Sequence, residues 1–398
     1  MTGEPPALRI AVNTLCSTVG GGRTHLLKVL PRIFEMGRRH AFTVFVARED
    51  LADFRTLGAP NVTWEVVGFR GVDAARRLIW ENVVLPFRLL ASRQDVVFAP
   101  ANLTHFAGGV PRVIVVHNVL PFYPELWSVE SFRSRMRLRL LARATRYFIG
   151  RAQATVFLSR TGRADALRGT HVVPREEAVV YHGVDPGFGG GDREAARRAV
   201  RERWGVRGPY ALYASHLYRY KKVESPIRAL ARMTSGPAGS LELVVAGTPF
   251  DADYARSLRD EAERLGVAGR VHFLGSVEHD ALSLLHAGAA VVVFLSACEN
   301  CPNLVLEAMA SGRPLIVSDR SVMPELVGDA ALLVDPDRVD DVAAAVERAL
   351  TDERLAEQLG ARGRARAGEF TWQRSAEGIL RLLEHVGHGT KRSPSRSA

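Results

Sequence analysis

Two glutamates separated by eight positions flank the start of an expected helix. Glu299 and Glu307 bound the segment Glu-Asn-Cys-Pro-Asn-Leu-Val-Leu-Glu, which follows an apolar run that ends at Leu295. Pro302 suits the first helical position, because its missing N–H needs no partner there. The next three amides would stay unpaired and could bind phosphate or sugar oxygens. They belong to Asn303, Leu304 and Val305. The two carboxylates could accept hydrogen bonds from two hydroxyl-bearing parts of one extended ligand.

An alternation of short apolar strands and amphipathic helices must position these residues. In the second half we expect strands at residues 210–215, 241–246, 271–274, 290–295 and 314–318, with helices at 226–233, 253–265, 279–286 and 303–310. In the first half we expect strands at residues 8–12, 42–46, 62–67, 95–98, 112–117 and 154–158. Such runs are typical of buried parallel strands, so the fold class is α/β with doubly wound sheets.

The chain of 398 residues is long enough for two domains, because single cores stop growing near ~250 residues. The pattern breaks into glycines and a proline after Tyr181 and ends with the triplet at 189–191. We therefore predict an N-terminal domain over residues 1–185 and a second domain over 186–369. A terminal helix over 370–388 and a disordered Gly/Ser/Arg tail over 389–398 complete the prediction.

Composition narrows the class of protein. Apolar residues make up 47% and charged residues 24%, as in ordinary globular proteins. No apolar run approaches the ~20 residues that span a bilayer, and the N-terminal residues do not resemble a secretion signal. Three cysteines suit a reducing compartment, so we expect a cytoplasmic protein. The net charge of +10 is uneven, because residues 1–180 hold 25 basic and 14 acidic residues, a balance of +11, and the remainder carries −1.

Two features of the first half could contact a ligand. Glycines at positions 20–22 lie between the first strand and the first helix, where Gly21 and Gly22 let backbone amides approach a phosphate or an acceptor. His117 ends a buried strand, where an imidazole can hold a hydroxyl of a donor or of an acceptor. In open parallel sheets, ligands bind beyond the carboxyl ends of the strands. We therefore expect the site in a crevice between the two sheets.

The Glu-x7-Glu segment, with Cys-Pro-Asn inside it and Glu-Ala-Met-Ala-Ser-Gly-Arg-Pro after it, resembles the retaining glycosyltransferase family 4. Other landmarks of the family follow in their usual order. They are the segments at 217–224, 273–275, 323–331 and 370–372. The resemblance implies a GT-B fold, in which two Rossmann-like domains face a central cleft and the terminal helix crosses back onto the first. It also implies transfer of a hexose-type sugar from a nucleotide sugar to a hydroxyl acceptor. The anomeric configuration of the sugar would be retained, and no cofactor would be needed.

The resemblance assigns roles to individual residues. Glu299 would hold a hydroxyl of the transferred sugar, Glu307 would bind the ribose, and Lys221 would neutralise the diphosphate. A cation placed there stabilises the charge that the leaving group gains as the glycosidic bond breaks. His117 matches the family's sugar-contacting histidine.

One departure from the family concerns the phosphate-binding cation. The family often has an arginine five or six residues before the lysine, where this chain has Ser215 and His216. Arg219 or Lys222 could substitute. We therefore count His216 and Lys222 among the expected donor-binding residues.

Three other motifs favour plainer interpretations. Cys298 and Cys301 have the spacing of a redox or zinc motif, but no second ligand pair accompanies them. Asp251 and Asp253 open an expected helix, where acidic residues cap the N-terminus. The glycine triplet does not satisfy the Gly-x-Gly-x-x-Gly pattern of dinucleotide-binding enzymes. We expect a metal-independent enzyme with no metal-binding residues.

The basic excess includes an expected helix with arginines at 133, 135, 137 and 139 among apolar residues. Such a helix could meet an anionic surface, most simply the inner face of the membrane, or could merely be solvated. Two alternative functions remain open. One is a same-fold phosphorylase or epimerase, and the other is a polyanion-binding protein on this scaffold. The interior carboxylates Glu299 and Glu307 argue against nucleic acid as a partner.

Overall fold

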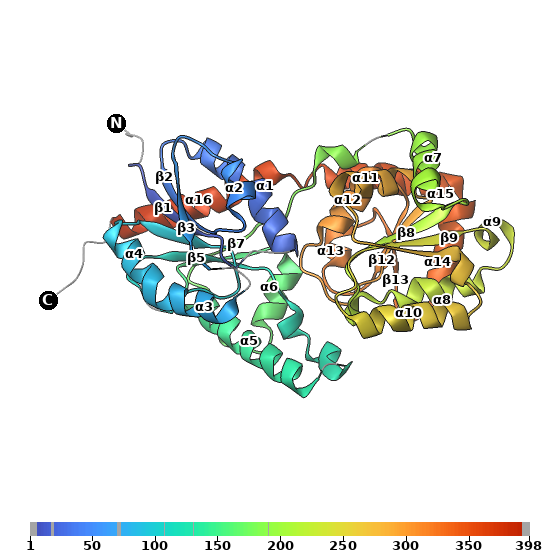
Figure 1. Ribbon diagram of the computed structural model, residues 1–398, viewed down its shortest axis with the longest axis horizontal. Helices are drawn as coiled ribbons and strands as arrows, with labels where there is room; N and C mark the ends of the chain where they lie inside the picture. Colours follow the sequence, from blue (N-terminus) through green and yellow to red (C-terminus); the bar gives the residue numbers. More distant parts are fainter. Residues whose placement is uncertain are drawn as a thin grey trace. The chain divides into compact units, whose positions relative to one another are not determined.

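The computed structural model describes residues 6–16, 20–69, 73–106, 108–129, 131–189 and 191–391. The chain divides into two compact units, each a parallel sheet flanked by helices (Figure 1). Unit 1 comprises Met1–His182 and Trp372–Ala398, and unit 2 comprises Gly183–Thr371. The units separate after His182 rather than after residue 185. The Val184 N–H donates to the Phe370 carbonyl at 3.1 Å, so the two connecting segments are paired within unit 2.

Unit 1 contains a seven-stranded parallel sheet in the order β3-β2-β1-β4-β5-β6-β7. Its strands are β1 (Arg9–Asn13), β2 (Ala41–Ala47), β3 (Val62–Val67), β4 (Val96–Ala99), β5 (Arg112–Val116), β6 (Ala154–Phe157) and β7 (Glu177–Val179). Central strands β4 and β6 are buried at every residue, which agrees with the continuous apolar runs expected of parallel strands covered on both faces. The edge strand β7 has three residues and was not predicted from the sequence.

The helices of unit 1 are α1 (Gly20–Met36), α2 (Leu51–Arg55), α3 (Ala74–Ile79), α4 (Leu85–Ala91), α5 (Phe132–Arg151), α6 (Arg160–Leu167) and α16 (Trp372–Lys391). One turn of π-helix, η1 (Trp80–Val84), joins α3 to α4, and the short 3-10 turns η2 (Leu120–Phe122) and η3 (Pro124–Val129) precede α5. None of the helices in the described residues is both long enough and apolar enough to cross a membrane.

The terminal helix α16 belongs to unit 1 and packs against α1. Its Glu384 accepts a hydrogen bond from His40 at 2.9 Å and pairs with Arg39. Gly387 lies against Leu8, where an added Cβ would come within 2.7 Å of that side chain. The helix continues to Lys391, so the prediction that disorder begins at residue 389 was wrong for residues 389–391. The rest of the expected tail lies outside the described residues.

Unit 2 contains a six-stranded parallel sheet in the order β10-β9-β8-β11-β12-β13. Its strands are β8 (Tyr210–Ala214), β9 (Glu242–Ala246), β10 (Val271–Gly275), β11 (Val291–Phe294), β12 (Leu315–Ser318) and β13 (Leu332–Val334). Its helices are α7 (Arg193–Trp204), α8 (Glu224–Arg232), α9 (Gly236–Gly239), α10 (Ala252–Arg264), α11 (His279–Gly288), α12 (Asn303–Ser311), α13 (Met323–Val327), α14 (Val339–Thr351) and α15 (Glu353–Ala367), with 3-10 turns η4 (Pro186–Phe188), η5 (Arg219–Lys221) and η6 (Ala268–Arg270).

The strand order reverses once in each sheet. In unit 1 both β2 and β4 pair with β1, and in unit 2 both β9 and β11 pair with β8. Connections leave such a pair of strands in opposite directions, which opens a crevice at their carboxyl ends. Two positions in this fold are therefore ready to receive a ligand. They lie beyond β1 and β4 in unit 1, and beyond β8 and β11 in unit 2.

Close backbone contact at Gly247 holds the loops at this edge of unit 2. A Cβ built on Gly247 would lie 1.8 Å from the Ser215 carbonyl oxygen, whereas one built on Gly269 meets nothing within 4 Å. Because neighbouring backbone must move, we expect Gly247→Ala to destabilise the protein by about 2 kcal/mol or more. Gly269→Ala should leave the melting temperature nearly unchanged. Thermal unfolding of the two variants tests this, and equal melting temperatures would contradict it.

Candidate functional site

An ion pair lies at the point where the strand order of unit 2 reverses. Lys221 follows β8 in the turn η5, and Glu299 follows β11. The Lys221 ammonium donates to the Glu299 carboxylate, and both side chains are nearly nine-tenths buried. The two residues expected to contact different parts of a ligand therefore contact each other. A ligand that engages both must separate them.

The backbone of η5 fixes the position of Lys221. The Tyr213 hydroxyl donates to the Lys221 carbonyl, and the Ala297 N–H donates to the Tyr220 carbonyl at 2.8 Å. The ammonium lies 5.3 Å from the ring centre of Tyr220 and 5.2 Å from that of Phe294, distances at which aromatic faces attract a cation. Lys221 is thus held as a buried positive charge with few polar neighbours.

The loop that carries Glu299 is braced from the next strand. Ser321 follows β12, and its hydroxyl accepts from the Glu299 N–H at 3.0 Å and donates to the Glu299 carbonyl at 2.8 Å. Ser321 has a φ of 55°, a value that only a few per cent of non-glycine residues adopt. We did not predict this reciprocal contact from the sequence. It fixes the backbone of the loop without engaging the carboxylate, which pairs with Lys221.

Helix α12 carries Glu307 at its second turn. The helix begins at Asn303, and Pro302 is its extended N-cap residue, so the prediction that Pro302 takes the first helical position was wrong by one residue. The Val305 N–H donates to the Pro302 carbonyl at 3.1 Å, which corrects the expectation that this amide is unpaired. Leu304 is half-buried at the start of the helix, and Glu307 is buried.

Two glycines of α15 set the position of α12. A Cβ on Gly360 would lie 2.2 Å from the Gly312 carbonyl oxygen, and a Cβ on Gly363 would lie 3.0 Å from that of Met309. The two helix backbones therefore pack closer than any larger residue would permit. This contact holds the C-terminal end of α12 against α15 and so fixes the helix that carries Glu307.

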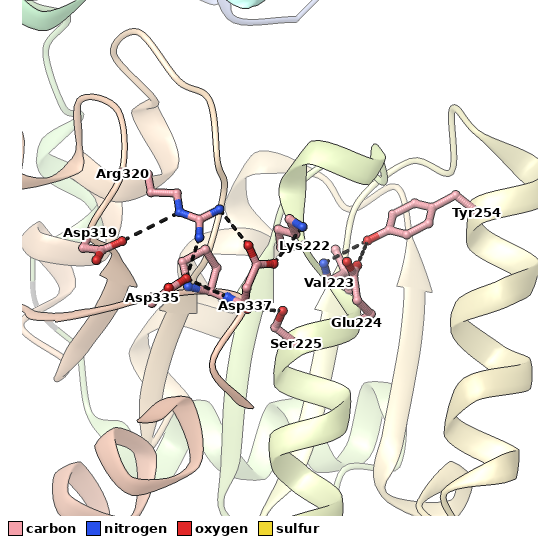
Figure 2. Close-up of polar contacts among 10 residues, drawn as sticks. Lys222, Val223, Glu224, Ser225, Tyr254, Asp319, Arg320, Asp335 and Asp337 are labelled. Atoms are coloured by element: carbon pink, nitrogen blue, oxygen red, sulfur yellow. Dashed lines mark hydrogen bonds and ion pairs between the residues drawn. The ribbon is translucent and has the colours of Figure 1, made fainter. Parts of the chain in front are cut away.

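Lys222 pairs with Asp337 (Figure 2). Its Nζ lies 2.8 Å from Asp337 Oδ1, and Arg320 approaches the same aspartate at 2.8 Å and Asp335 at 2.6 Å. Burial alone would raise the pKa of Asp337, but the hydrogen bonds from Lys222 and Arg320 bring it below its ordinary value. Lys222 itself adopts a φ of 56°. These contacts suit a residue that shapes the loop, and they engage the charge that we expected to assist Lys221.

The start of α8 is fixed in the same region (Figure 2). The Tyr254 hydroxyl accepts from the Val223 N–H at 2.9 Å and donates to the Glu224 carboxylate, while the Ser225 hydroxyl donates to the Pro336 carbonyl at 2.6 Å. These bonds tie the loop after η5 to both α10 and the segment after β13. The turn that carries Lys221 is therefore followed by a loop that is hydrogen-bonded to α10 and to the segment after β13.

The other candidate cation, Arg219, also has an acidic partner. Its Nε lies 3.4 Å from Asp251, and its guanidinium lies 5.4 Å from the Tyr254 ring centre. Asp251 caps α10 by accepting from the Tyr254 N–H at 2.9 Å, which confirms the capping interpretation of that residue.

His216 is exposed at the carboxyl end of β8, where the family often has an arginine. Its ring lies 4.9 Å from that of Phe250 in an edge-to-face contact. Desolvation and the nearby charge of Lys221 lower the pKa of His216, so the imidazole is neutral near pH 7. It can donate or accept one hydrogen bond beside Lys221 but adds no positive charge.

In unit 1 the glycine triplet forms the first turn of α1 rather than a separate loop. The helix begins at Gly20, whose φ is 67°, and a Cβ on Gly20 or Gly21 would meet nothing within 4 Å. Gly22 follows in the same turn. The expectation of a loop between strand and helix was therefore wrong for residues 20–22, while residues 17–19 lie outside the described residues.

Asn102 orients the end of the strand that carries His117. Its Oδ1 accepts from the His117 and Asn118 N–H groups, both at 2.9 Å, and its Nδ2 donates to the Asn118 carbonyl at 2.8 Å. We did not single out Asn102 from the sequence, although its place just beyond a buried strand was a usable signal. Desolvation, with a smaller contribution from His182, lowers the pKa of His117 to about 3. The imidazole is charged only below that pH.

Three histidines of unit 1 gather beyond the carboxyl ends of its strands. The ring of His25 stacks on that of His182 at 4.7 Å and lies edge-on to that of His117 at 5.2 Å. One ligand atom of each lies within 4.8 Å of the others, and this is the one group of metal-ligand type found in the described residues. Burial, then the other two histidines, lowers the pKa of His25 well below its ordinary value. Sequence spacing gave no hint of this cluster.

The geometry of the cluster favours packed neutral rings. A tetrahedral metal needs lone pairs that converge on one point. His25 and His182 are inclined by only 20°, so their ring edges run side by side. Cys298 and Cys301 are buried thiols that are not joined in a disulfide, and neither belongs to that group.

Helix α5 spans the arginine-rich segment as one helix of 20 residues. Arg133, Arg137 and Arg139 are exposed, whereas Arg135 is half-buried. Residues two apart in a helix point in different directions. The four arginines therefore do not share one face of the helix.

Two family models match the chain. Residues 19–188 match the model described as Glycosyltransferase Family 4, and residues 197–366 match the model described as Glycosyl transferases group 1. An O-antigen chain mannosyltransferase B of Escherichia coli is 31% identical over 41% of this chain and 42% of its own length. A D-inositol 3-phosphate glycosyltransferase of Rhodococcus opacus is 28% identical over 56% and 55%, and an alpha-D-kanosaminyltransferase of Streptomyces kanamyceticus is 29% identical over 63% and 64%. The chain thus spans about two fifths to two thirds of these relatives' lengths.

Solved structures share the fold over nearly the whole chain. Anabaena HepE in complex with UDP and glucose superposes with a TM-score of 0.74 at 18% identity, over 95% of this chain and 100% of that chain. A sucrose-phosphate synthase from Thermosynechococcus elongatus gives a TM-score of 0.77 at 17% identity, over 97% and 100%. The two-sheet architecture derived from the strand pattern is therefore that of known proteins.

Proposed function

Because the chain belongs to glycosyltransferase family 4, of GT-B fold, we propose that it transfers a hexose-type sugar from a nucleoside diphosphate sugar to a hydroxyl acceptor. The observation that carries this proposal is the Lys221–Glu299 ion pair at the strand-order reversal of unit 2. One charge suits the diphosphate of a donor and the other suits its sugar hydroxyls. In HepE, which has this fold, the bound ligands are UDP and glucose.

In the proposed reaction the donor occupies unit 2. Lys221 leaves Glu299 and binds the diphosphate, Glu299 accepts from a hydroxyl of the transferred sugar, and Glu307 accepts from the ribose. Half-buried Leu304 and its neighbours at the start of α12 lie where backbone amides favour anionic or hydroxyl oxygens. His216 adds a neutral hydrogen-bonding group next to Lys221.

Charge development explains why these residues would accelerate the transfer. As the bond between sugar and diphosphate breaks, the leaving phosphate gains negative charge, and a buried ammonium stabilises that state more than the ground state. We assign no carboxylate of the site as a covalent nucleophile, because Glu299 is proposed to accept a hydrogen bond from a sugar hydroxyl. We therefore favour a same-face displacement, in which the leaving phosphate takes the acceptor's proton and the anomeric configuration is retained. The reaction needs no metal, because Lys221 supplies the positive charge.

The acceptor is proposed to bind unit 1. His117 is neutral above about pH 3, so it can donate or accept a hydrogen bond with an acceptor or sugar hydroxyl across the physiological range. Gly21 is exposed and Gly22 is half-buried in the first turn of α1, and a Cβ on Gly21 would meet nothing within 4 Å. We propose that the exposed arginines of α5 meet an anionic surface and that the protein acts in the cytoplasm or at the inner face of the membrane.

A thermal-shift screen against UDP, GDP, ADP and dTDP sugars tests the proposal. A ligand at 100 times its dissociation constant stabilises the folded protein by about 2.7 kcal/mol. We expect one nucleotide family to raise the melting temperature and to support transfer to an added acceptor. Turnover of the sugar without an acceptor would indicate a phosphorylase or epimerase. No response to any nucleotide sugar, with salt-sensitive nucleic-acid binding, would overturn the proposal.

Glu307→Ala is expected to weaken binding of the nucleoside diphosphate about tenfold or more, because a charged acceptor of a hydrogen bond contributes ~1.5–3 kcal/mol. The Kd for the nucleotide identified in the screen, measured by calorimetry, checks this. Glu347, which is exposed on α14, provides the control variant Glu347→Ala. Equal nucleotide affinities for the two variants would contradict the role of Glu307.

A further inference from the structure

We propose that unit 1 inserts a patch of apolar side chains into an anionic lipid leaflet, with arginines around the patch bound to the headgroups. This patch, called here the apolar–arginine surface, is formed by α3, η1, α4, the residue Phe106 and α5. Its apolar members are Leu78, Ile79, Val83, Phe87, Leu90, Phe106, Phe132, Met136, Leu140 and Tyr147. The inference rests on the proposed function only for its purpose, which is to bring the enzyme to an acceptor held at a membrane.

The first strip of this surface lies on α5. The inner face of the helix is marked by buried residues such as Leu138, Ala142 and Thr145. Met136, Leu140 and Tyr147 recur at intervals of four and seven and therefore share the opposite face, given about 3.6 residues per turn. All three are exposed, as is Phe132 at 69%. A helix of this kind normally presents polar residues outward.

Arginines border this strip on both sides. Helical spacing places Arg133 and Arg137 along one edge of the strip and Arg139 and Arg143 along the other. All four are exposed, and no ion pair is recorded for any of them in the described part of the chain. Helix α5 contains seven arginines and no acidic residue. An apolar strip between two basic edges is the pattern of helices that lie in a membrane interface.

The second strip runs along α3, η1 and α4. Ile79, Val83, Phe87 and Leu90 follow one another at intervals of four, four and three, and all are exposed. Phe87 is 72% exposed although its neighbours Pro86 and Leu89 are buried. Exposed apolar residues scattered singly need no explanation, but a row of four does.

Phe106 joins the two strips. It is exposed, and its ring lies 5.8 Å from that of Tyr147 on α5. Its N–H donates to Asn82 of η1 at 2.8 Å, and the nearby Gly109 lies against Leu90 of α4. The exposed apolar residues therefore form one continuous patch and not two separate ones.

Charge favours a lipid leaflet over a second copy of the chain as the occupant. In a two-fold dimer the same surface lies on both subunits, so the arginines of α5 would meet their own copies across an interface that has no acidic residue from α5. An anionic leaflet supplies the opposite charge to the arginines and hydrocarbon to the patch. Each arginine near such a leaflet should strengthen binding about fivefold.

The experiment uses vesicles of phosphatidylcholine with and without phosphatidylglycerol. The first variant is Phe87→Trp. Its added tryptophan emission, taken as the difference from the parent protein, should be quenched when the acyl chains of the vesicle lipids are brominated. The matched control carries Phe250→Trp, because Phe250 is an exposed phenylalanine of unit 2. Its added emission should not be quenched. Two further variants separate charge from insertion, namely Phe87→Ser with Leu90→Ser, and Arg133, Arg137 and Arg139 changed together to glutamine.

The serine variant should still sediment with anionic vesicles at low salt but release at physiological salt, where the parent stays bound. The arginine variant should lose about a hundredfold in affinity for anionic vesicles. Equal quenching in both tryptophan proteins, or a Phe87→Trp emission that vesicles do not change, would overturn the proposal. Salt-resistant dimerisation that the serine variant abolishes would assign the patch to a second copy. Nucleotide binding in solution is measured separately, so failure of the proposed function would be seen independently.

Discussion

Glu299→Gln should lower turnover about a hundredfold or more while nucleoside diphosphate binding survives. The amide keeps the size of the side chain but loses the charge that would strengthen the hydrogen bond to the sugar as the glycosidic bond breaks. Loss of one such electrostatic contact commonly costs about 10²–10³ in rate. The comparison protein is Glu347→Gln, whose side chain is exposed on α14. Initial rates at saturating donor provide kcat, and calorimetry provides the Kd of the diphosphate.

The ion pair adds a second expectation for this variant. Glu299 pairs with the ammonium of Lys221, so a donor phosphate must compete with a carboxylate. The neutral glutamine removes that competitor, and affinity for the diphosphate should stay equal or rise. Transfer at the parental rate would show that Glu299 does not contact the reacting sugar. A large loss of diphosphate affinity would show that the two carboxylates do not have separate roles.

The fold was largely predictable because each buried parallel strand has a continuous apolar run. Both sheets and their central strands were expected within a few residues of their observed bounds, and the arginine-rich segment was expected to be a helix. The edge strands β7 and β13 were not, since each has only three residues and partial exposure. Helices α14 and α15 were also missed. Their positions depend on close packing, such as that of Gly360 against Gly312, which no local pattern reveals.

The site residues were predictable where one continuous segment contains both the functional side chain and the helix or loop that positions it. The loop and helix from Glu299 to Glu307 are such a segment. Contacts between distant segments were not predictable, because nothing local in the sequence pairs Lys222 with Asp337 or gathers His25, His117 and His182. Lys222 illustrates the difficulty most clearly. Its type and position suggested a phosphate ligand, but its left-handed backbone turns the side chain toward an aspartate.

Lys221→Met should reduce turnover about 10²–10³-fold, which is the usual cost of removing one charge from an electrostatic transition-state contact. Methionine keeps much of the apolar stem that packs beside Tyr220 and Phe294, so folding should survive. The matched variant is Lys222→Met. Its ion pair with Asp337 is partly exposed, and such pairs contribute about 1 kcal/mol at most. Lys222→Met should therefore have a slightly lower melting temperature than the parent protein and keep most of its activity.

Chelation by EDTA should cost far less activity than Lys221→Met. Lys221 is already a buried cation at the strand-order reversal where the diphosphate is proposed to bind, so charge neutralisation there does not call for a second ion. The measurement compares kcat for the parent with and without EDTA, and for Lys221→Met and Lys222→Met without it. Activity lost on chelation and restored by magnesium or manganese would reject the metal-free mechanism and direct attention to Asp251 and Asp253. Restoration by zinc alone would instead implicate His25, His117 and His182, and His25→Ala should then abolish the effect of zinc.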